Sequence, residues 1–530
     1  MSQMLKSSGA MGAATLASRV LGMVREMVYA RFMGDGWVAG AFVLAFTIPN
    51  LFRRLLGEGA LTAAFIPILK EKEHTADTAT LWRAANAVLT TLVIVSVVLI
   101  LVVWKGLNVA LDQHVFSKET RLMLELLRVM FPYMLLVCIA AVFIGILNAR
   151  GHFFIPALGA TMLNVVMIVA VLWGTRFFGR RLEEQVFALA IGVLVAGVAQ
   201  AAFQIPTLRG EGFRFQWVWP WRDDTVGRVV RQMIPGTIGV AAFQINVLVT
   251  QGVAFWVDAP IVASFNYAVR LLELPQGVFG VSLATYLLPT LAGLAVKKNY
   301  NEFRATLRQG LGYIIFINLL ASVLLFVLAE PIVRLLFERG QFGPDATQRA
   351  AYALRCLAPG LVFFSMVNIT ARAFYALGDT TTPMKISLVC LFSNAVLALW
   401  MVLPRGKGGL GLEQGGLGVA NTVSAGFNAW LLLLALRDRL DHLGFGALRR
   451  SLGPNIAITA VAGVAAWGVG WYWEKRFQHD SLQDQLGAVF VPAASAALLY
   501  LILALLLRIP AARETGTVIW RKLVKMFTSG

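Results

Sequence analysis

Runs of apolar residues about as long as a bilayer is thick alternate along the chain with short polar segments. A helix needs about 20 apolar residues to cross the hydrocarbon core. By this criterion the pattern predicts fourteen membrane-spanning helices, with no interval long and polar enough for a soluble domain. The predicted spans are residues 9–33, 37–68, 83–104, 122–148, 154–175, 185–207, 229–257, 260–291, 307–328, 347–376, 383–403, 415–436, 453–473 and 485–507. The pattern therefore indicates an all-α polytopic membrane protein.

Composition supports this interpretation and excludes others. Hydrophobic residues make up 58% of the chain and charged residues only 14%, against about 25% charged in soluble proteins. Much of the net charge of +18 lies in short loops, where it orients membrane proteins, so it does not indicate nucleic-acid binding. Cys138, Cys356 and Cys390 lie in apolar segments and predict packing residues, not a disulfide framework or zinc site. We expect no metal or cofactor, and no G-x-x-x-x-G-K-[ST] loop of an ATPase occurs.

The distribution of Lys and Arg among the loops predicts the topology. With both termini inside, cytoplasmic segments hold 24 of the 46 basic residues and the opposite loops hold 13. Positive charge favours the cytoplasmic side, so we expect both termini in the cytoplasm. Residues 208–228 combine Arg with Trp217, Trp219 and Trp221, a mixture typical of segments at the membrane interface.

Three pairs of matching motifs indicate an internal repeat. Two pairs lie 227 residues apart: Arg128-x-x-x-Pro132 with Arg355-x-x-x-Pro359, and Gly151-x-x-x-x-Pro156 with Gly378-x-x-x-x-Pro383. The third pair, Pro67 with Pro289 in similar segments, lies 222 residues apart. Because such offsets span six helices, an even number, the copies share one orientation, which predicts two six-helix lobes related by an axis along the membrane normal. The predicted divisions are an N-terminal lobe at 1–207, an interfacial linker at 208–228, a C-terminal lobe at 229–436, and two extra helices with a basic tail at 437–530.

Charged side chains occur inside the predicted spans. Each costs about 2.5–3.5 kcal/mol on insertion, so such residues usually face a cavity or a partner. The first two spans contain Arg19, Arg25, Glu26, Arg31, Arg53, Arg54 and Glu58, and the eighth contains Arg270 and Glu273. In the first span, Ser18, Gly22, Arg25 and Tyr29 recur at helical spacing and form one polar face.

Cations outnumber acids in this set, which predicts a cationic cavity between the lobes for an anionic substrate. Guanidinium groups bind phosphate oxygens through paired donors, a geometry that Lys lacks. We therefore predict that Arg19, Arg25, Arg53 and Arg270 bind substrate. The alternative is that each arginine forms a structural ion pair, such as Arg19 with Glu26 or Arg53 with Glu58. The repeat-related Arg128 and Arg355 fit either role.

Three blocks of the sequence resemble a known transporter family. Ser18-Arg19-Val20-Leu21-Gly22-Met23-Val24-Arg25-Glu26 is similar to its S-R-x-L-G-x-x-R-[DE] signature. Pro49-Asn50-Leu51-Phe52-Arg53-Arg54, Glu58-Gly59-Ala60 and Ala64-Phe65-Ile66-Pro67 resemble its P-N-x-x-R-R…E-G-A…A-F-x-P block, and Tyr267-Ala268-Val269-Arg270-Leu271 with Pro275, Gly277 and Gly280 resembles its second-lobe signature. Over all fourteen spans the chain is similar to the MurJ (MviN) family of lipid II flippases, in the multidrug/oligosaccharidyl-lipid/polysaccharide exporter superfamily.

The resemblance implies a carrier, not an enzyme, of the bacterial cytoplasmic membrane. Its implied substrate is lipid II, an undecaprenyl-diphosphate-linked disaccharide-pentapeptide that is moved from the inner to the outer face. The arginines would hold the diphosphate, and the last two helices would form a groove for the polyprenyl tail. The implied supporting cavity residues are Ser18, Glu26, Glu58 and Glu273. The expected partners are lipid II, membrane lipids and other cell-wall synthesis proteins, but no nucleic acid.

The chain departs from the family pattern in two places. Gly40 stands where many members carry an acid after the first helix. Some members bind sodium with an acid in the seventh helix, where this chain offers only Gln244, Asn246 and Gln251. We therefore expect no sodium site of that type and take the membrane potential as the driving force.

Other functions fit the residues less well. Another carrier of the same superfamily, a multidrug antiporter or an O-antigen-type flippase, is the alternative within this class. Drug antiporters usually need a carboxylate for ion exchange, whereas arginine dominates the charges here. A membrane-embedded glycosyltransferase would need catalytic acids in a substantial external loop, but the external loops are short. A scaffold that transports nothing would leave the intramembrane arginines unexplained.

Overall fold

The computed structural model describes residues 2–57, 60–75, 77–113, 115–219, 223–440, 446–477 and 481–512. Every regular element in these ranges is a helix. Ten of the described helices are long and apolar enough to cross a membrane, or twelve if each of two bent pairs counts as one span. α1 (Ser2–Met33) and α10 (Asp224–Val257) are also of spanning length, and together these helices cover all the predicted spans. The prediction of an all-α polytopic membrane protein is confirmed.

The chain divides by contacts into two compact units. Unit 1 holds Met1–Ala263 with Arg339–Phe342, and unit 2 holds Ser264–Glu338 with Gly343–Gly530. α10 thus belongs to unit 1, although the repeat pattern assigns 229–257 to the second lobe; the repeat-based lobes remain a prediction. The other elements of unit 1 are α2 (Trp37–Phe52), η1 (Arg53–Gly57), α3 (Ala60–Thr75), α4 (Thr78–Asp112), α5 (Lys118–Met130), α6 (Tyr133–Ala149), α7 (Phe154–Leu172), η2 (Gly174–Phe177), α8 (Leu182–Ala202) and α9 (Ile205–Gly210).

The elements of unit 2 begin with α11, whose first residues belong to unit 1. They are α11 (Ala259–Pro275), η4 (Gln276–Val281), α12 (Ser282–Val296), α13 (Tyr300–Val327), α14 (Ala329–Phe337), α15 (Pro344–Leu357), α16 (Gly360–Ala376), α17 (Thr381–Val402), η5 (Arg405–Lys407), α18 (Glu413–Arg439), α19 (Gly446–Arg476) and α20 (Leu482–Leu506). The short helix α14 was not predicted, because it is too brief to span a membrane. It buries Val333 and Phe337 while Arg334 bonds Glu330 on its polar side.

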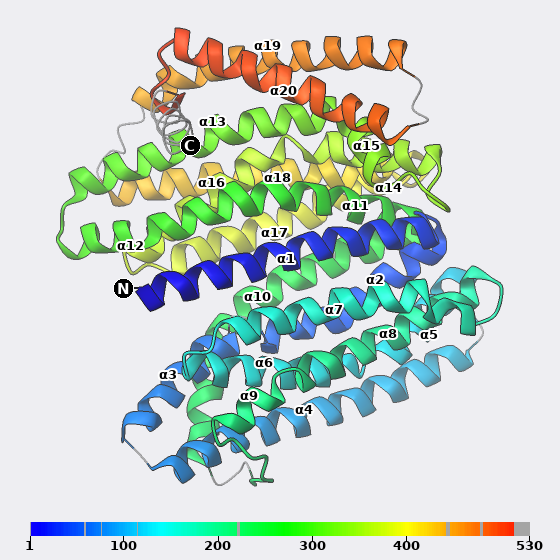
Figure 1. Cartoon of the computed structure of the whole chain (residues 1–530), viewed down its shortest axis with the longest axis vertical. Helices are drawn as coiled ribbons and strands as arrows, with labels where there is room; N and C mark the ends of the chain where they lie inside the picture. Colours follow the sequence, from blue (N-terminus) through cyan, green and yellow to red (C-terminus); the bar gives the residue numbers. More distant parts are fainter. Residues whose placement is uncertain are drawn as a thin grey trace. The chain divides into compact units, whose positions relative to one another are not determined.

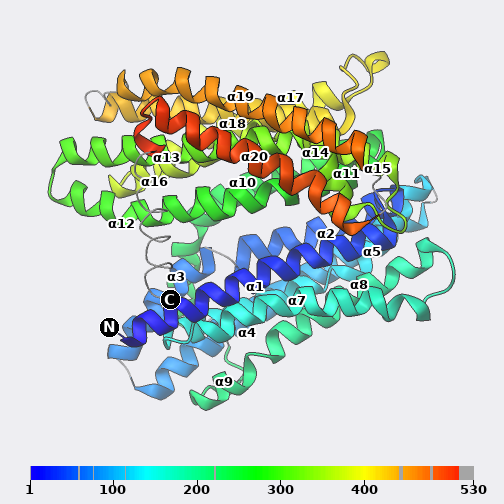
Figure 2. The same cartoon turned by 45° about the horizontal axis from the view of Figure 1, so that its top comes forward.

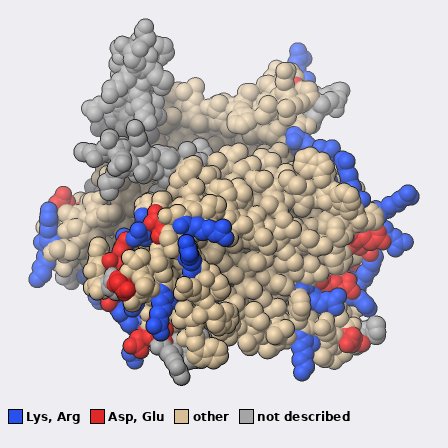
Figure 3. All heavy atoms as spheres, turned by 60° about the horizontal axis from the view of Figure 1, so that its bottom comes forward, with Lys and Arg blue, Asp and Glu red and all other residues tan. Residues whose placement is uncertain are grey.

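Neighbouring helices within each unit run side by side. In unit 1, α7 packs between α1 and α8 (Figures 1 and 2). In unit 2, α19 packs against both α13 and α20, and the buried Tyr500 hydroxyl donates to the Phe316 carbonyl at 2.8 Å. Seen from the side of α4 and α9, charged side chains gather toward the helix ends and leave a broad uncharged surface between them (Figure 3). That distribution suits a hydrocarbon environment around the middle of the helices.

The repeated motifs adopt the same local structures in the two units. α5 and α6 meet at Pro132 with a bend of 42°, and α15 and α16 meet at Pro359 with a bend of 47°. Gly151 and Gly378 end α6 and α16 with positive φ of 85° and 76°. At both ends the next N–H bonds a carbonyl five residues back: His152 to Leu147 and Asp379 to Phe374. The sequence repeat is therefore also a repeat of backbone conformation.

A second backbone repeat lies in the two spans that carry Arg53 and Arg270. Each of these spans is interrupted by a π-helical segment, η1 at Arg53–Gly57 and η4 at Gln276–Val281. The segments begin 223 residues apart, close to the offset of the surrounding sequence match. π-Helical turns inside α-helices occur frequently at functional sites. The repeat thus places an irregular turn at the same point of both spans.

The side chain of Asn86 in α4 bonds the middle of the predicted interfacial linker. Asn86 donates to the Arg214 carbonyl at 3.0 Å and accepts from the Gln216 N–H at 3.2 Å. The side chains of Trp217 and Trp219 are 57% and 58% exposed, while Trp221 lies outside the described residues. Exposed tryptophans suit a membrane interface, and that role for 208–228 stays a prediction.

An ion-pair network joins the end of α3, the α6–α7 connection and the end of α9. Arg150 bonds Glu73 at 2.5 Å and Glu211 at 2.8 Å, and His152 contacts Glu211 at 2.7 Å. Hydrogen bonds from His152 and then Arg150 lower the pKa of Glu211 below its ordinary value of 4.5. The hydrogen bond from Lys70 is the main reason why the pKa of Glu73 is also lowered.

Acid is therefore expected to destabilise this end of unit 1. A carboxyl group whose pKa is lower in the folded than in the unfolded state stabilises the fold at pH values above the unfolded-state pKa. This stabilisation is lost as the pH falls through the folded-state pKa. The midpoint of thermal unfolding should fall more steeply below about pH 4.5 in the wild type than in Glu211→Gln. Parallel curves for the two proteins would contradict a role for Glu211.

Candidate functional site

The polar face predicted for α1 packs closely against α7. Asn164 of α7 donates from Nδ2 to the Ser18 carbonyl at 3.2 Å. One turn further, a Cβ at Gly22 would lie 3.7 Å from the same Nδ2 atom. Small residues at these positions let the two backbones approach, as is common between membrane helices. Ser18 and Gly22 therefore position α1.

Arg25 forms a buried ion pair with its chain neighbour. Its Nη2 contacts Glu26 Oε1 at 2.5 Å, and the two side chains are only 12% and 4% exposed. The guanidinium carbon lies 5.4 Å from the centre of the Tyr29 ring, within cation–π range. Tyr29 meets Phe42 of α2 edge-on at 5.8 Å. Arg25 and Glu26 thus belong to the interface of α1 with its neighbours in this conformation.

Arg19 differs from Arg25 in its surroundings. Its residue is exposed, and its side chain makes no hydrogen bond or ion pair with any residue in the described ranges. The suggested structural pair of Arg19 with Glu26 is therefore not formed here. An exposed guanidinium on a membrane span is a donor group available to an anion.

Arg53 opens the π-helical turn η1 and is oriented by the preceding turn. Its Nε donates to Asn50 Oδ1 at 2.7 Å. Pro49 within α2 cannot donate a backbone hydrogen bond, which favours irregular structure nearby. Glu58, the suggested partner of Arg53, lies outside the described residues. Asn50 therefore orients the guanidinium group of Arg53.

Arg270 occupies the related span of unit 2. It donates from Nη1 to Glu273 Oε2 at 2.9 Å, and the side chains are 32% and 46% exposed. The pair lies one to two turns before η4, which begins at Gln276. Each unit therefore places an arginine at or near the π-helical interruption of its span.

Three residues that shape the site were not predicted as site residues. Asn50 lies inside the P-N-x-x-R-R block, so its spacing of three from Arg53 was a usable signal. Tyr29 was placed on the right face of α1, but its contact with Arg25 was not foreseen. Asn164 carries no signal in the sequence, because it meets α1 only through the tertiary fold.

Metal-binding groups are sparse in the described part of the chain. No group of three or more His, Cys, Asp or Glu side chains that could hold a metal occurs there. In α10, Gln244 and Asn246 are buried at 5% and 8% exposure. Thr47 donates to Gln251 Oε1 at 3.2 Å. These amides are uncharged hydrogen-bonding side chains within α10.

The chain is similar to known proteins over most of its length. The family model described as "Lipid II flippase MurJ" matches residues 29–484. The probable lipid II flippase MurJ of Haemophilus influenzae is 33% identical, covering 86% of this chain and 90% of its own. The lipid II flippase MurJ of Burkholderia cenocepacia is 34% identical, and the match covers 86% of this chain and 88% of that protein.

Solved structures share the fold. A lipid II flippase MurJ in an inward closed conformation matches with a TM-score of 0.74 and 21% identity, covering 97% of this chain and 99% of that chain. An inward-facing multidrug resistance transporter of the MATE family matches with a TM-score of 0.65 and 17% identity, covering 81% and 96%. At such identities the structures show the common fold alone. The family match and the relatives go further: this chain belongs to the lipid II flippase MurJ family.

Proposed function

We propose that this protein moves lipid II from the cytoplasmic to the outer leaflet of the bacterial inner membrane by alternating access. The observation that carries the proposal is the family match over residues 29–484, which covers nearly every span. Membership makes the chain a multi-pass transporter and not an enzyme. The fold is shared with multidrug carriers, but the family match favours lipid II over their substrates.

The arginines supply the chemistry that the substrate needs. A diphosphate carries several acceptor oxygens, and guanidinium groups bind such oxygens through two parallel hydrogen bonds. Arg19 is exposed on α1, Arg53 is oriented by Asn50, and Arg270 keeps a side chain 32% exposed. Arg25 would require a change in its buried pair with Glu26 before it binds substrate. We assign diphosphate binding to Arg19, Arg53 and Arg270, with Arg25 engaged in another state of the transport cycle.

The polyprenyl tail requires an apolar path along the membrane. α19 and α20 pack with α13 around a buried cluster that includes Phe316, Ala462 and Tyr500. Their outer surfaces carry exposed apolar side chains such as Val464 and Phe490, at 68% and 61% exposure. We assign the tail to these two helices. We place both termini in the cytoplasm. We also propose that the membrane potential drives one step of the transport cycle, because moving one elementary charge through 100 mV is worth about 2.3 kcal/mol.

Depletion of the protein in its host, with rescue by variants, tests the proposal. The readout is the accessibility of lipid II at the outer surface, compared at equal membrane levels of each variant. We expect the wild type to restore exposure and Arg19→Ala, Arg53→Ala and Arg270→Ala to fail. Arg180→Ala is the matched control, because Arg180 is exposed in the connection before α8.

Each outcome decides a different point. Loss of a bidentate guanidinium contact costs about 1.5–3 kcal/mol, so each failing variant should lower exposure about tenfold or more. Full rescue by all three variants would make these arginines structural. If depletion leaves exposure unchanged in a host with no second flippase, lipid II is not the substrate.

A further inference from the structure

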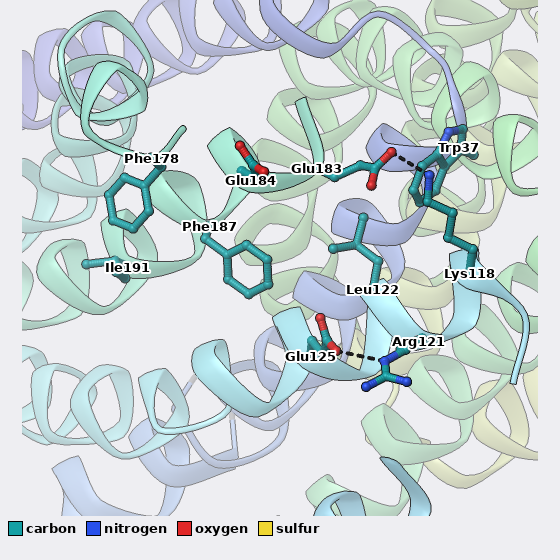
Figure 4. Close-up of a pocket in the computed structure, with 10 residues that line it drawn as sticks. All are labelled: Trp37, Lys118, Arg121, Leu122, Glu125, Phe178, Glu183, Glu184, Phe187 and Ile191. Carbon is teal, nitrogen blue, oxygen red and sulfur yellow. Dashed lines mark hydrogen bonds and ion pairs between the residues drawn. The ribbon is translucent and has the colours of Figure 1, made fainter. Parts of the chain in front are cut away.

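Unit 1 contains a cavity of about 540 Å³ whose lining includes none of the arginines assigned to the diphosphate. It opens where α5 and α8 begin, at the end of the unit where α2 also begins (Figure 4). Its walls come from α2, α5, α8 and the connection before α8. Pockets of about 300–1,000 Å³ are the usual size for small-molecule ligands.

The cavity has a charged side along α5, from Lys118 to Glu125, and an apolar side along α8. Lys118 and Glu183 lie at the starts of α5 and α8. Phe187 and Ile191 of α8 lie further in, and a rise of about 1.5 Å per residue puts Ile191 about 12 Å beyond Glu183. The side chains in Figure 4 follow this order, with Lys118 and Glu183 near Trp37 and Phe187 and Ile191 deeper along α8. A ligand that fits must combine a polar part with an apolar part.

The residues around the mouth of the cavity are typical of the membrane interface. Three spans begin around it, and the connection between α7 and α8 exposes Trp173 and Phe177 at 56% and 84%. Trp37 begins α2 at the same mouth. Aromatic side chains concentrate where headgroups meet the hydrocarbon core.

The lining of the cavity carries two cations and three carboxylates. Lys118 Nζ lies 2.6 Å from Glu183 Oε1 and 4.8 Å from the Trp37 ring centre, and Arg121 Nε lies 3.1 Å from Glu125 Oε1. A further carboxylate, Glu184, is engaged locally by the Arg180 and Arg181 N–H groups. Because the backbone N–H groups are neutral, the lining keeps one net negative charge, so a ligand that carries an ammonium beside its phosphate suits the mouth better than an anion.

The existing ion pairs are easily exchanged. The side chains of Lys118 and Glu183 are 65% and 33% exposed, and those of Arg121 and Glu125 are 49% and 30% exposed. Exposed ion pairs contribute little to stability. A headgroup that carries both a phosphate and an ammonium can replace each internal contact with one of its own.

We propose that this cavity binds a phospholipid with a phosphoethanolamine headgroup from the adjoining leaflet. The phosphate accepts hydrogen bonds from Lys118 and Arg121, and the primary ammonium donates to Glu183 and Glu125. An acyl chain follows Phe187 and Ile191. A choline headgroup has the same charges but no N–H donors, so it binds more weakly.

Photocrosslinking of the purified full chain in lipid nanodiscs tests this site. The probe is phosphatidylethanolamine with a photoreactive group in one acyl chain, and crosslinked peptides are mapped by mass spectrometry. We expect crosslinks on α5 and α8 that unlabelled phosphatidylethanolamine displaces and phosphatidylcholine does not. Crosslinks confined to other helices, or equal displacement by both lipids, would overturn the proposal.

Two variants separate the headgroup and chain contacts. Lys118→Gln/Glu183→Gln removes both charges at similar size and should reduce crosslinking about tenfold, since hydrogen bonds to charged groups are lost. Ile191→Trp keeps the charges and fills the apolar end, so it should reduce crosslinking even if the first variant fails to fold. Arg228→Gln/Glu71→Gln is the matched control, because it removes an exposed ion pair of 2.6 Å at the other end of the helices of unit 1. Unchanged crosslinking in a folded Ile191→Trp protein would rule the cavity out.

Discussion

Replacing Glu26 by alanine is expected to destabilise the protein by about 3–5 kcal/mol, because it leaves a buried cation without its carboxylate. Arg25 is only 12% exposed, and Glu26 is its ion-pair partner at 2.5 Å. The Tyr29 ring at 5.4 Å would offset only a small part of the loss. The measurement is the midpoint of thermal unfolding in detergent micelles. A midpoint equal to that of the wild type would show that the pair does not stabilise α1.

The double variant Arg25→Met/Glu26→Met provides the control for this prediction. Replacing both members of a buried ion pair with apolar side chains is often neutral or stabilising. We therefore expect the double variant to unfold near the wild-type temperature, well above Glu26→Ala.

The double variant also separates the two roles considered for Arg25. If it folds and restores lipid II exposure, the pair holds α1 in place and has no part in substrate binding. If it folds but fails to restore exposure, Arg25 acts on the substrate in a conformation other than this one. The single variant cannot make this distinction, since loss of stability and loss of transport would occur together.

The sequence was sufficient to locate the membrane helices, because each needs a run of apolar residues that few other structures use. The repeat was also visible, and Pro132 and Pro359 proved to mark matching bends. The π-helical turns were not predicted, although a proline precedes each of them, Pro49 in α2 and Pro275 at the end of α11. Helix α14 was missed because its nine residues are too short for a membrane span.

The candidate site was only partly predictable. Charge inside a span identified Arg19, Arg25 and Arg53 as unusual, since such residues are costly in lipid. The surroundings of each arginine depend on contacts with residues far away in the sequence and on the rotamer of its side chain. Arg25 is buried against Glu26, whereas Arg19 is exposed, although both lie on α1 within two turns. Periodicity assigns residues to a face but does not reveal which helix covers that face.

Gly40→Ala is expected to destabilise unit 1 by about 1–3 kcal/mol or more, because a side chain there overlaps another backbone. A Cβ on Gly40 of α2 would lie 2.1 Å from the Ala259 carbonyl oxygen, where ordinary contacts are 3.4–4 Å. The obstacle is backbone at the start of α11, so no rotamer change relieves it. We expect a lower thermal midpoint and a smaller fraction of monodisperse protein in detergent.

Gly106→Ala is the matched control, since it makes the same change within a helix of the same unit. A Cβ at Gly106 of α4 meets nothing within 4 Å, so alanine should stabilise that helix by up to about 1 kcal/mol. Equal stability of the two variants would show that α2 does not approach Ala259 so closely. The resemblance implies an acid at this point in many family members, and in this chain such a side chain has no space beside Ala259. Any carboxylate that the transport cycle needs must therefore come from elsewhere in this chain. For the same reason we expect Gly40→Asp to fail to fold and not to gain activity.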